Sequence, residues 1–403
     1  MAHHVGSRAV PTSGQRCDRV HVLYLIDSLV AGGAERSLAA LAPHLVGAGV
    51  ALEVATLHDR PGVQEELIAA GVPLYCLADG GGRVGWIRRT TRLVQDRQPD
   101  LVHTTLFEAD LAGRIAATRC RVPVVSSLVN VAYGPEQRAS SGVALLKLEA
   151  ARLADAVTAR PVVRFHAVSE HVADVMAARL HLRRSRVEVV PRGRDPRRLG
   201  TRTAERRARA RAALGVGPDA TVILATGRQE PQKGFDTLVE AVPGVLGAVP
   251  TAQFFIAGRE GNHTRRLREL VERLGVLDAV RFLGVRADVY ELLCAADVFA
   301  FPSRWEGMPG VILEAMALQA PIVASDLPPV REAVRDRASA WLVPPGQPGA
   351  LARAVVGTLH DPAGAARRAA RAHADFLDRF TIGHAADGML AFYDKALSRT
   401  RLR

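Results

Sequence analysis

The sequence predicts an α/β protein built from two doubly wound parallel-sheet domains. Two observations lead to this fold class. From residue 20 onward, short apolar runs of strand length alternate with segments in which apolar residues recur at helical spacing, an order typical of parallel sheets covered by helices. The chain also has 403 residues, more than one hydrophobic core usually holds, and 48% of them are hydrophobic, which is sufficient for two cores.

The first domain is expected over residues 20–192. The first 19 residues lack both periodicity and the apolar core of a signal peptide, which predicts a mobile leader. Strands and helices then alternate. The strands are expected at 20–26, 51–57, 72–77, 100–105 and 122–127, and the helices from 34 and near 62–70, 83–97, 108–118 and 142–155. The segments RFHAVSEHV and VEVVPRGRD close this domain.

Two glycines, Gly32 and Gly33, follow the first predicted strand. Because they lack side chains, they would let backbone amides at the start of the next helix approach a ligand. Two glycines after a strand often form only a turn, so the two interpretations stay open on this observation alone.

The second domain is expected over residues 193–379, and its first strand is TVILATGR at 221–228. Arg228 ends this strand and Lys233 lies in the next loop, where both could meet phosphate oxygens. Lys233 is informative because only three of the 53 basic residues are lysines, the others being Lys147 and Lys395. A lysine here suggests a need for a compact positive charge. The alternative is an exposed loop cation.

Residues 297–319 predict a buried strand at 298–301, a tight loop, and a helix that begins at Pro309. This geometry holds ligands at the carboxyl ends of parallel strands. Glu306 lies in the loop and Glu314 in the helix, whose first amides, at Gly310 and Val311, are free to bind phosphate. Both acids could simply be solvated. However, Glu314 has apolar neighbours in sequence, and a buried carboxylate needs a partner.

The spacing of Glu306 and Glu314 within WEGMPGVILEAMA resembles the paired-glutamate motif of the retaining glycosyltransferases of family 4. The resemblance implies the GT-B fold, in which two Rossmann-like domains face a central cleft. It implies that Glu314 holds the ribose of a nucleotide diphosphate sugar, and that Glu306 contacts the sugar near the reacting carbon.

The same resemblance extends from about residue 20 to residue 397. Arg228 and Lys233 match a GRxxxQKG-type segment that binds the donor diphosphate, and the turn at Gly32 and Gly33 matches one that faces this diphosphate. Gly284, in VRFLG, matches a turn that borders the base. The resemblance further implies that a C-terminal helix, at 380–403, crosses back to complete the first domain.

The chain departs from this family at two places. Many relatives carry a histidine just past the strand equivalent to 122–127, whereas Val129 or Asn130 stands there in this chain. His103 is a candidate substitute on the acceptor side, as is Asn130, although a lone histidine at a strand end is more often structural. Relatives also read asparagine, glycine, valine, aspartate where this chain has RGRD at 192–195.

Arginine dominates the charge of the chain, which is +12 with a pI of about 10.4. Residues 183–211 alone contain twelve arginines. A solvated surface and linker is the first interpretation of this segment. The alternative is a patch that holds an anionic membrane or a phosphate-bearing acceptor.

Other classes of protein fit less well. A dinucleotide-linked oxidoreductase would have GxGxxG after its first strand, and GGAERS lacks it. A nucleic-acid binder would interleave aromatic and basic residues, but aromatics are only 5%. A sugar-nucleotide epimerase or a phosphorylase of the same fold stays open, because either would keep the phosphate-binding groups.

The sequence therefore predicts a retaining glycosyltransferase that moves a sugar from a nucleotide diphosphate sugar to a hydroxyl acceptor, which could be a glycan, a lipid-linked molecule or a small molecule. The expected catalytic residues are Glu306, Arg228 and Lys233. No cofactor or metal is expected, since the chain has no Asp-x-Asp pair and no His/Cys cluster. Four scattered cysteines indicate a cytoplasmic protein, which could be peripheral at the inner face of the membrane.

Overall fold

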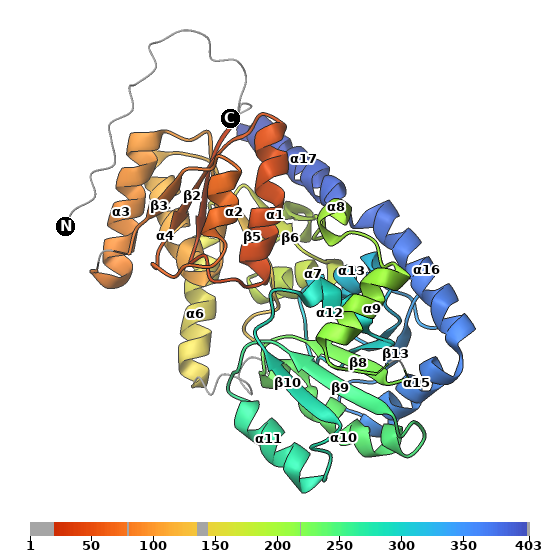
Figure 1. Ribbon diagram of the computed structural model, residues 1–403. Helices are drawn as coiled ribbons and strands as arrows, with labels where there is room; N and C mark the ends of the chain where they lie inside the picture. Colours follow the sequence, from red (N-terminus) through yellow and green to blue (C-terminus); the bar gives the residue numbers. More distant parts are fainter. Residues whose placement is uncertain (1–19, 79, 135–143, 218, 401–403) are drawn as a thin grey trace, which may run out of the picture.

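The computed structural model describes residues 20–78, 80–134, 144–217 and 219–400, which form two α/β lobes side by side (Figure 1). The leader predicted for residues 1–19 lies outside these ranges, as do the last three residues of the predicted helix 380–403. All strand pairs in the two sheets are parallel, and the predicted fold class is therefore confirmed.

The first sheet has seven strands in the order β3-β2-β1-β4-β5-β6-β7. They are β1 (His21–Ile26), β2 (Ala51–Thr56), β3 (Leu74–Cys76), β4 (Leu101–Thr105), β5 (Val124–Leu128), β6 (Arg164–Ala167) and β7 (Val187–Val189). The helices around it are α1 (Gly33–Gly47), α2 (Gln64–Ala69), α3 (Gly82–Arg97), α4 (Phe107–Cys120), α6 (Leu145–Thr158) and α7 (Glu170–Arg179). Strand β1 is almost wholly apolar because helices cover both faces of the sheet, whereas β4 and β5 also bury polar residues, among them His103 and Ser127.

The second sheet has six strands in the order β10-β9-β8-β11-β12-β13. They are β8 (Thr221–Thr226), β9 (Ala252–Ala257), β10 (Val280–Gly284), β11 (Val298–Phe301), β12 (Ile322–Ser325) and β13 (Trp341–Val343). Its helices are α9 (Ala204–Ala213), α10 (Phe235–Leu246), α11 (Thr264–Arg273), α12 (Val289–Ala295), α13 (Gly310–Ala317), α14 (Pro328–Arg331), α15 (Pro348–His360) and α16 (Pro362–Arg379). The strand order reverses between β8 and β11, which is where ligands bind in such sheets.

The chain passes between the lobes twice, and the two passages are hydrogen-bonded to each other. The amide of Arg194 donates to the carbonyl of Phe380 at 2.9 Å, and the amide of Ile382 donates to the carbonyl of Arg194 at 2.8 Å. Beyond this point α17 (Ile382–Thr400) returns to the first lobe and packs against α1 (Figure 1). Residue 194 therefore lies at the hinge between the sheets.

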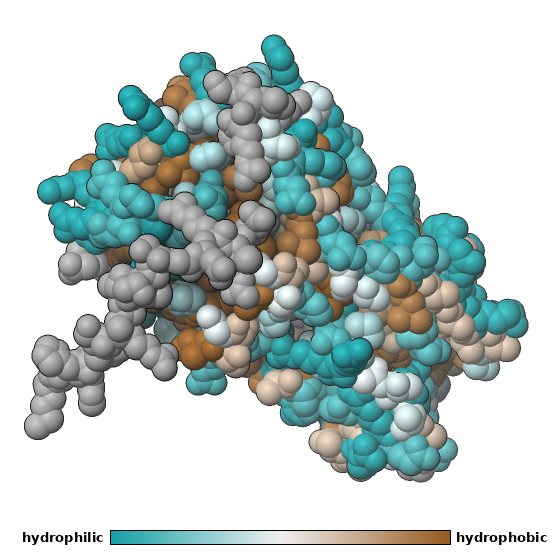
Figure 2. Space-filling model, turned by 90° about the horizontal axis from the view of Figure 1, so that it is seen from above, coloured by the Kyte–Doolittle hydropathy of each residue, from teal (hydrophilic) through white to brown (hydrophobic). Residues whose placement is uncertain are grey.

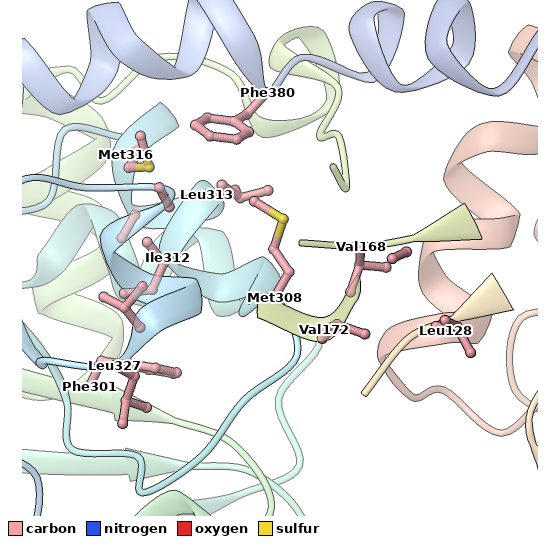
Figure 3. Close-up of a cluster of buried hydrophobic side chains, with 14 of the residues drawn as sticks. Leu128, Val168, Val172, Phe301, Met308, Ile312, Leu313, Met316, Leu327 and Phe380 are labelled. Carbon is pink, nitrogen blue, oxygen red and sulfur yellow. The ribbon is translucent and has the colours of Figure 1, made fainter. Parts of the chain in front are cut away.

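The lobes also meet through an apolar cluster beside the hinge. Met308, in the loop before α13, lies between Leu313 of the second lobe and Val168 and Val172 of the first (Figure 3). The hydroxyl of Ser169 donates to the carbonyl of Gly307 at 2.8 Å. The loop that carries Glu306 is thus held against the first lobe.

The arginine-rich segment 183–211, which includes α8 (Pro196–Leu199), is mostly neither a solvated linker nor a free basic patch. Arg206 pairs with Glu291 at 2.8 Å, and Arg207 and Arg211 both pair with Asp297. Arg202 donates to backbone carbonyls at the end of α12. These contacts hold α9 against the second lobe. The arginine-rich segment is therefore largely structural, which neither interpretation made from the sequence had predicted.

The surface seen in Figure 2 is mainly hydrophilic, with separate hydrophobic areas between charged side chains. Among the helices of the described ranges, none combines the length and the apolar composition that crossing a bilayer requires.

Candidate active site

The two glutamates of the paired motif lie at the carboxyl end of β11 and in α13. The helix begins at Gly310, and Pro309 is its N-cap residue, one position earlier than the first-turn place predicted for it. Glu306 and Glu314 are each only 8% exposed. Neither is a solvated side chain, which excludes that alternative for both.

Each buried glutamate has a cationic partner. Lys233 Nζ lies 2.6 Å from Glu306 Oε1, and Arg194 Nε lies 2.7 Å from Glu314 Oε1. Burial of an unpaired carboxylate costs several kcal/mol, so these cations offset a penalty that either acid alone would carry. The first pair joins two residues predicted to be catalytic, and the second contains an arginine that the sequence did not indicate.

The loop that carries Lys233 is joined to the loop that carries Glu306. The short helix η2 (Pro231–Lys233) ends at Gly234, whose φ of 61° favours glycine and whose Cβ would lie 2.1 Å from the Pro302 carbonyl. Gln232 Nε2 donates to the carbonyl of Trp305 at 2.8 Å. Because Lys233 is held in this way and its side chain is 18% exposed, it is not a free loop cation.

A salt bridge beneath the two loops supports this arrangement. Both terminal nitrogens of Arg304 donate to the carboxylate of Asp236 at 2.8 Å, and Arg304 Nη1 also donates to the carbonyl of Pro231. A bidentate pair of this kind fixes orientation as well as distance. Neither residue was predicted, because nothing local in the sequence indicates that they meet.

Arg228 follows β8 and faces the glycine turn of the first lobe. Burial raises the pKa of Glu35, in the first turn of α1, while the nearby charges of Arg192 and Arg228 oppose this shift. Gly32 is packed against Glu35, since a Cβ on this glycine would lie 2.5 Å from Oε2. Gly33 is equally crowded by Arg192, which comes from the segment that links the lobes, whereas Glu35 belongs to the same turn as Gly32; a close approach from outside the turn is therefore seen at Gly33.

The remaining donor-side residues lie at the same edge of the second sheet. No hydrogen bond to a described residue is formed by the amides of Gly310 and Val311, as expected in the first turn of a helix. Gly284 ends β10 with φ 64°, and its carbonyl accepts from the Gly258 amide at 2.7 Å. The structure brings Glu306, Lys233 and Gly310 together, and it places Gly284 farther along the sheet edge.

The two acceptor-side candidates have different environments. Asn130 is exposed at the end of β5, and Gly307 packs directly against its Cα and against the carbonyl of Val129. His103 is 0% exposed and lies between Tyr393 and Ser127, with hydrogen bonds of 2.8 and 2.7 Å. Burial holds the pKa of His103 well below its usual value. This position does not fit the predicted contact with an acceptor, because the side chain is closed off from the cleft.

Several residues at the cleft escaped the sequence analysis. Arg192 and Arg194 were noticed only as a departure from the family pattern, and Glu35 was not singled out. His166 continues the buried chain from Ser127 and is held against the carbonyl of Val190, with its pKa lowered by burial to about 4. Histidine in a strand has no local signal that separates a core position from a site.

Within the described ranges, no three His, Cys, Asp or Glu side chains gather closely enough to hold a metal ion. Glu306 and Glu314 are each paired with a cation.

Two doubly wound parallel sheets in two lobes are the architecture of the GT-B fold, and the pairs Lys233–Glu306 and Arg194–Glu314 lie at the switch point of the second sheet. Residues 31–198 match the family described as Glycosyltransferase Family 4, and residues 220–361 match Glycosyl transferases group 1. The chain belongs to glycosyltransferase family 4, and it is a glycosyltransferase.

Relatives and solved structures agree with this assignment. The chain is 31% identical to the D-inositol 3-phosphate glycosyltransferase of Kineococcus radiotolerans over 91% of each chain, and 31% identical to that of Acidothermus cellulolyticus over 92% of this chain and 87% of the relative. The structure of Anabaena Alr3699/HepE in complex with UDP-glucose is similar with a TM-score of 0.82 and 24% identity, covering 94% of this chain and all of that one.

Proposed function

We propose that the protein transfers a sugar from a nucleotide diphosphate sugar, of the UDP type, to a hydroxyl acceptor with retention of the anomeric configuration. The observation that carries this is the pair of buried salt bridges, Lys233–Glu306 and Arg194–Glu314, at the switch point of the second sheet. A uridine nucleotide is favoured because the similar HepE structure contains UDP-glucose. The acceptor class is suggested by relatives named for D-inositol 3-phosphate.

The chemistry follows from where charge develops. As the glycosidic bond breaks, negative charge builds on the leaving phosphate, where Lys233, Arg228 and the amides of Gly310 and Val311 would stabilise it. Glu306 would contact the sugar near the reacting carbon. The leaving phosphate would take the proton of the acceptor hydroxyl, which accounts for retention without a further base.

The direct test is incubation with UDP-glucose and D-inositol 3-phosphate, followed by mass spectrometry and NMR of the product. We expect an α-linked glycoside and free UDP. An epimerase would change the sugar nucleotide without any acceptor, and a phosphorylase would require inorganic phosphate. Either result, or a β-linked product, would contradict the proposal.

Glu314→Ala is expected to weaken UDP binding by about 1.5 to 3 kcal/mol, the scale of a hydrogen bond to a charged group. The reason is that the carboxylate would accept from the ribose hydroxyls. Isothermal titration calorimetry measures this directly. Glu291→Ala is a matched control, because Glu291 also pairs with an arginine of segment 183–211 but lies on α12. Unchanged affinity in Glu314→Ala would remove this assignment.

We also propose that transfer needs no metal ion and no cofactor, because Lys233 and Arg228 would themselves face the leaving phosphate. Activity is expected to persist in excess chelator. The measurement is the initial rate of transfer with and without EDTA after exhaustive dialysis. A rate that collapses with EDTA and returns with magnesium would refute metal independence.

We also propose that the protein is peripheral to a cytoplasmic membrane. The face that would contact this membrane differs from the one that carries the arginine-rich segment. A hollow of about 500 Å³ lies over α4, between α3 and α6. Leu111 and Ile115 form its floor. The α6 helix adds an exposed apolar stripe along the hollow: Leu146, Ala150, Leu153 and Val157.

Three cations lie on the helices that line this hollow, which favours an anionic surface, although the acid Glu108 also lines it. Arg83 and Lys147 lie at the starts of α3 and α6, and Arg119 lies in the last turn of α4. None of the three forms a salt bridge with another residue of the described ranges. Apolar side chains beside unpaired cations bind the interface of an anionic bilayer.

Leu153→Glu is expected to reduce binding to phosphatidylglycerol-containing vesicles about tenfold, because burying one leucine contributes about 1.5 to 3 kcal/mol. Vesicle co-sedimentation measures the change. Ile68→Glu is the matched control, since Ile68 and Leu153 are both 60% exposed on the same lobe. Equal losses in both variants, or equal binding to neutral vesicles, would exclude this surface.

A further inference from the structure

The segment Arg192–Gly193–Arg194, called the strap below, crosses from the first lobe to the second, and Arg192 and Gly193 line a small pocket of the first lobe. Its backbone is fixed by the hydrogen bonds of Arg194 to the returning chain at Phe380 and Ile382. A Cβ on Gly193 would lie 2.5 Å from the carbonyl of Thr381, so the middle position is packed tightly.

Arg194 lies against the start of α13. Its Nε donates to Glu314 and its Nη1 to the carbonyl of Gly193, but Nη2 has no hydrogen-bond partner among the described residues. Nη2 is so close to Gly310 that a Cβ there would lie 1.8 Å away. The residue is 9% exposed. A guanidinium at a helix N-terminus opposes the helix dipole, which leaves two positive groups facing one place.

Arg192 crowds the glycine turn on the other side. Its Nη1 would lie 2.5 Å from a Cβ on Gly33, and its Nε is buried without a hydrogen-bond partner among the described residues. Burial, and then the charge of Arg194, lower the pKa of Arg192 to about 10, although Glu306 and Glu35 oppose this. The guanidinium of Arg192 therefore forms no salt bridge with a carboxylate of the described residues.

The charges of the cleft do not balance. Lys233 is paired with Glu306 and Arg194 with Glu314, which leaves Arg192 and the exposed Arg228 near the single carboxylate Glu35. A guanidinium withdrawn from water, as that of Arg192 is, is stabilised by an anion close to it. One further negative group would fit between Gly33 and Gly310.

We propose that the strap is an anion clamp that binds the diphosphate of the donor from the crossing between the lobes, with Arg192 on the side of Gly33 and Arg194 on the side of Gly310. This rests on the proposed donor class and adds two binding residues to it. The clamp distinguishes this chain from the family pattern, which has asparagine at position 192 and valine at position 194. Because the strap is the hinge, the clamp also ties donor binding to the relative position of the lobes.

The test restores the family residues in Arg192→Asn, Arg194→Val and the double variant. Calorimetry with UDP and with inorganic pyrophosphate is expected to show a loss of about 10- to 100-fold in affinity for each arginine removed. Uridine, which has no phosphate and is followed by ligand-observed NMR, is expected to bind as in the wild type. Arg197→Gln is the matched control, since Arg197 is an exposed arginine of the same crossing.

Arg194→Lys separates binding from folding. A lysine keeps a cation beside Glu314 but cannot also reach Gly310, so we expect a wild-type melting temperature together with a UDP affinity at least about tenfold weaker. If the double variant and Arg194→Lys bind UDP and pyrophosphate within twofold of wild type, the clamp is excluded. An equal loss for uridine and UDP would also exclude it.

The pyrophosphate measurement does not depend on the nucleotide or the reaction. Failure of the proposed function would appear as absent transfer by the wild type and by Arg197→Gln, with pyrophosphate binding still lost in the double variant. Failure of the clamp alone would leave transfer and UDP binding intact in Arg192→Asn and Arg194→Val.

Discussion

Lys233→Ala is expected to lower kcat for sugar transfer by about 100- to 1,000-fold, the typical cost of removing one preorganised group that stabilises developing charge. The ammonium lies 2.6 Å from Glu306 at the carboxyl end of β11. Its charge acts more strongly as the leaving phosphate gains negative charge than in the ground state. The loss should therefore appear mainly in kcat rather than in KM.

Lys233→Arg tests the shape of the cation as well as its charge. The methylenes of Lys233 pass 3.2 Å from the Cβ position of Gly227, and Nζ lies 5.7 Å from the ring centre of Phe301. A longer, planar guanidinium does not fit this passage, so activity should fall well below wild type while net charge is kept.

Lys395→Ala is the control for both substitutions, because Lys395 also pairs with a carboxylate at 2.6 Å, that of Glu188, but on the far side of the first lobe. Circular dichroism confirms the fold in each variant. Full activity in Lys233→Ala would remove the assignment of this loop to the donor phosphates.

The fold could be predicted because its signals are local. The five strand ranges predicted for the first lobe are each present within two residues, since strands covered on both faces are rich in apolar residues. The pairing of Glu306 with Glu314 along the chain is also local. The rarity of lysine in a chain with many arginines, which draws attention to Lys233, can likewise be read from the sequence.

The partners of these residues could not be predicted. Arg194 and Glu314 are 120 positions apart, and only the fold brings them together. Composition showed that residues 183–211 are rich in arginine, but not that Glu291 on α12 and Asp297 just before β11 pair with them. Likewise the sequence suggested that His103 stands at a strand end, but β4 continues to Thr105 and the side chain is buried against Tyr393 of α17.

The largest effect on stability is expected in the first lobe, at a buried salt bridge beneath the loop that follows β5. Arg114 on α4 is 0% exposed. It contacts Asp155 at 2.5 Å and Asp110 at 3.2 Å, and its Nε donates to Ser126 at 2.8 Å. The other oxygen of Asp155 accepts from the hydroxyl of Tyr133, which lies just beyond β5. The guanidinium of Arg114 therefore holds, through Asp155 and Tyr133, the loop after β5 that faces Glu306.

Burial raises the pKa of Asp110 to about 7 even though Arg114 opposes the shift. A pKa raised above its unfolded value means that the folded state binds the proton more tightly. This contribution to stability is complete below about pH 4 and is lost as the pH rises through 7. Above pH 7 both carboxylates depend on the single charge of Arg114.

Arg114→Ala is therefore expected to lower the free energy of unfolding by about 3 to 5 kcal/mol at pH 8, because it leaves two buried carboxylates without a cation. Urea denaturation followed by circular dichroism measures the change. Arg119→Ala, one turn along α4 but exposed, is expected to change stability by less than about 0.5 kcal/mol. Replacing Asp110 and Asp155 by asparagine in the Arg114→Ala background should recover part of the loss. A cost below about 1 kcal/mol in Arg114→Ala would show that water reaches this site and that the salt bridge does not hold the loop.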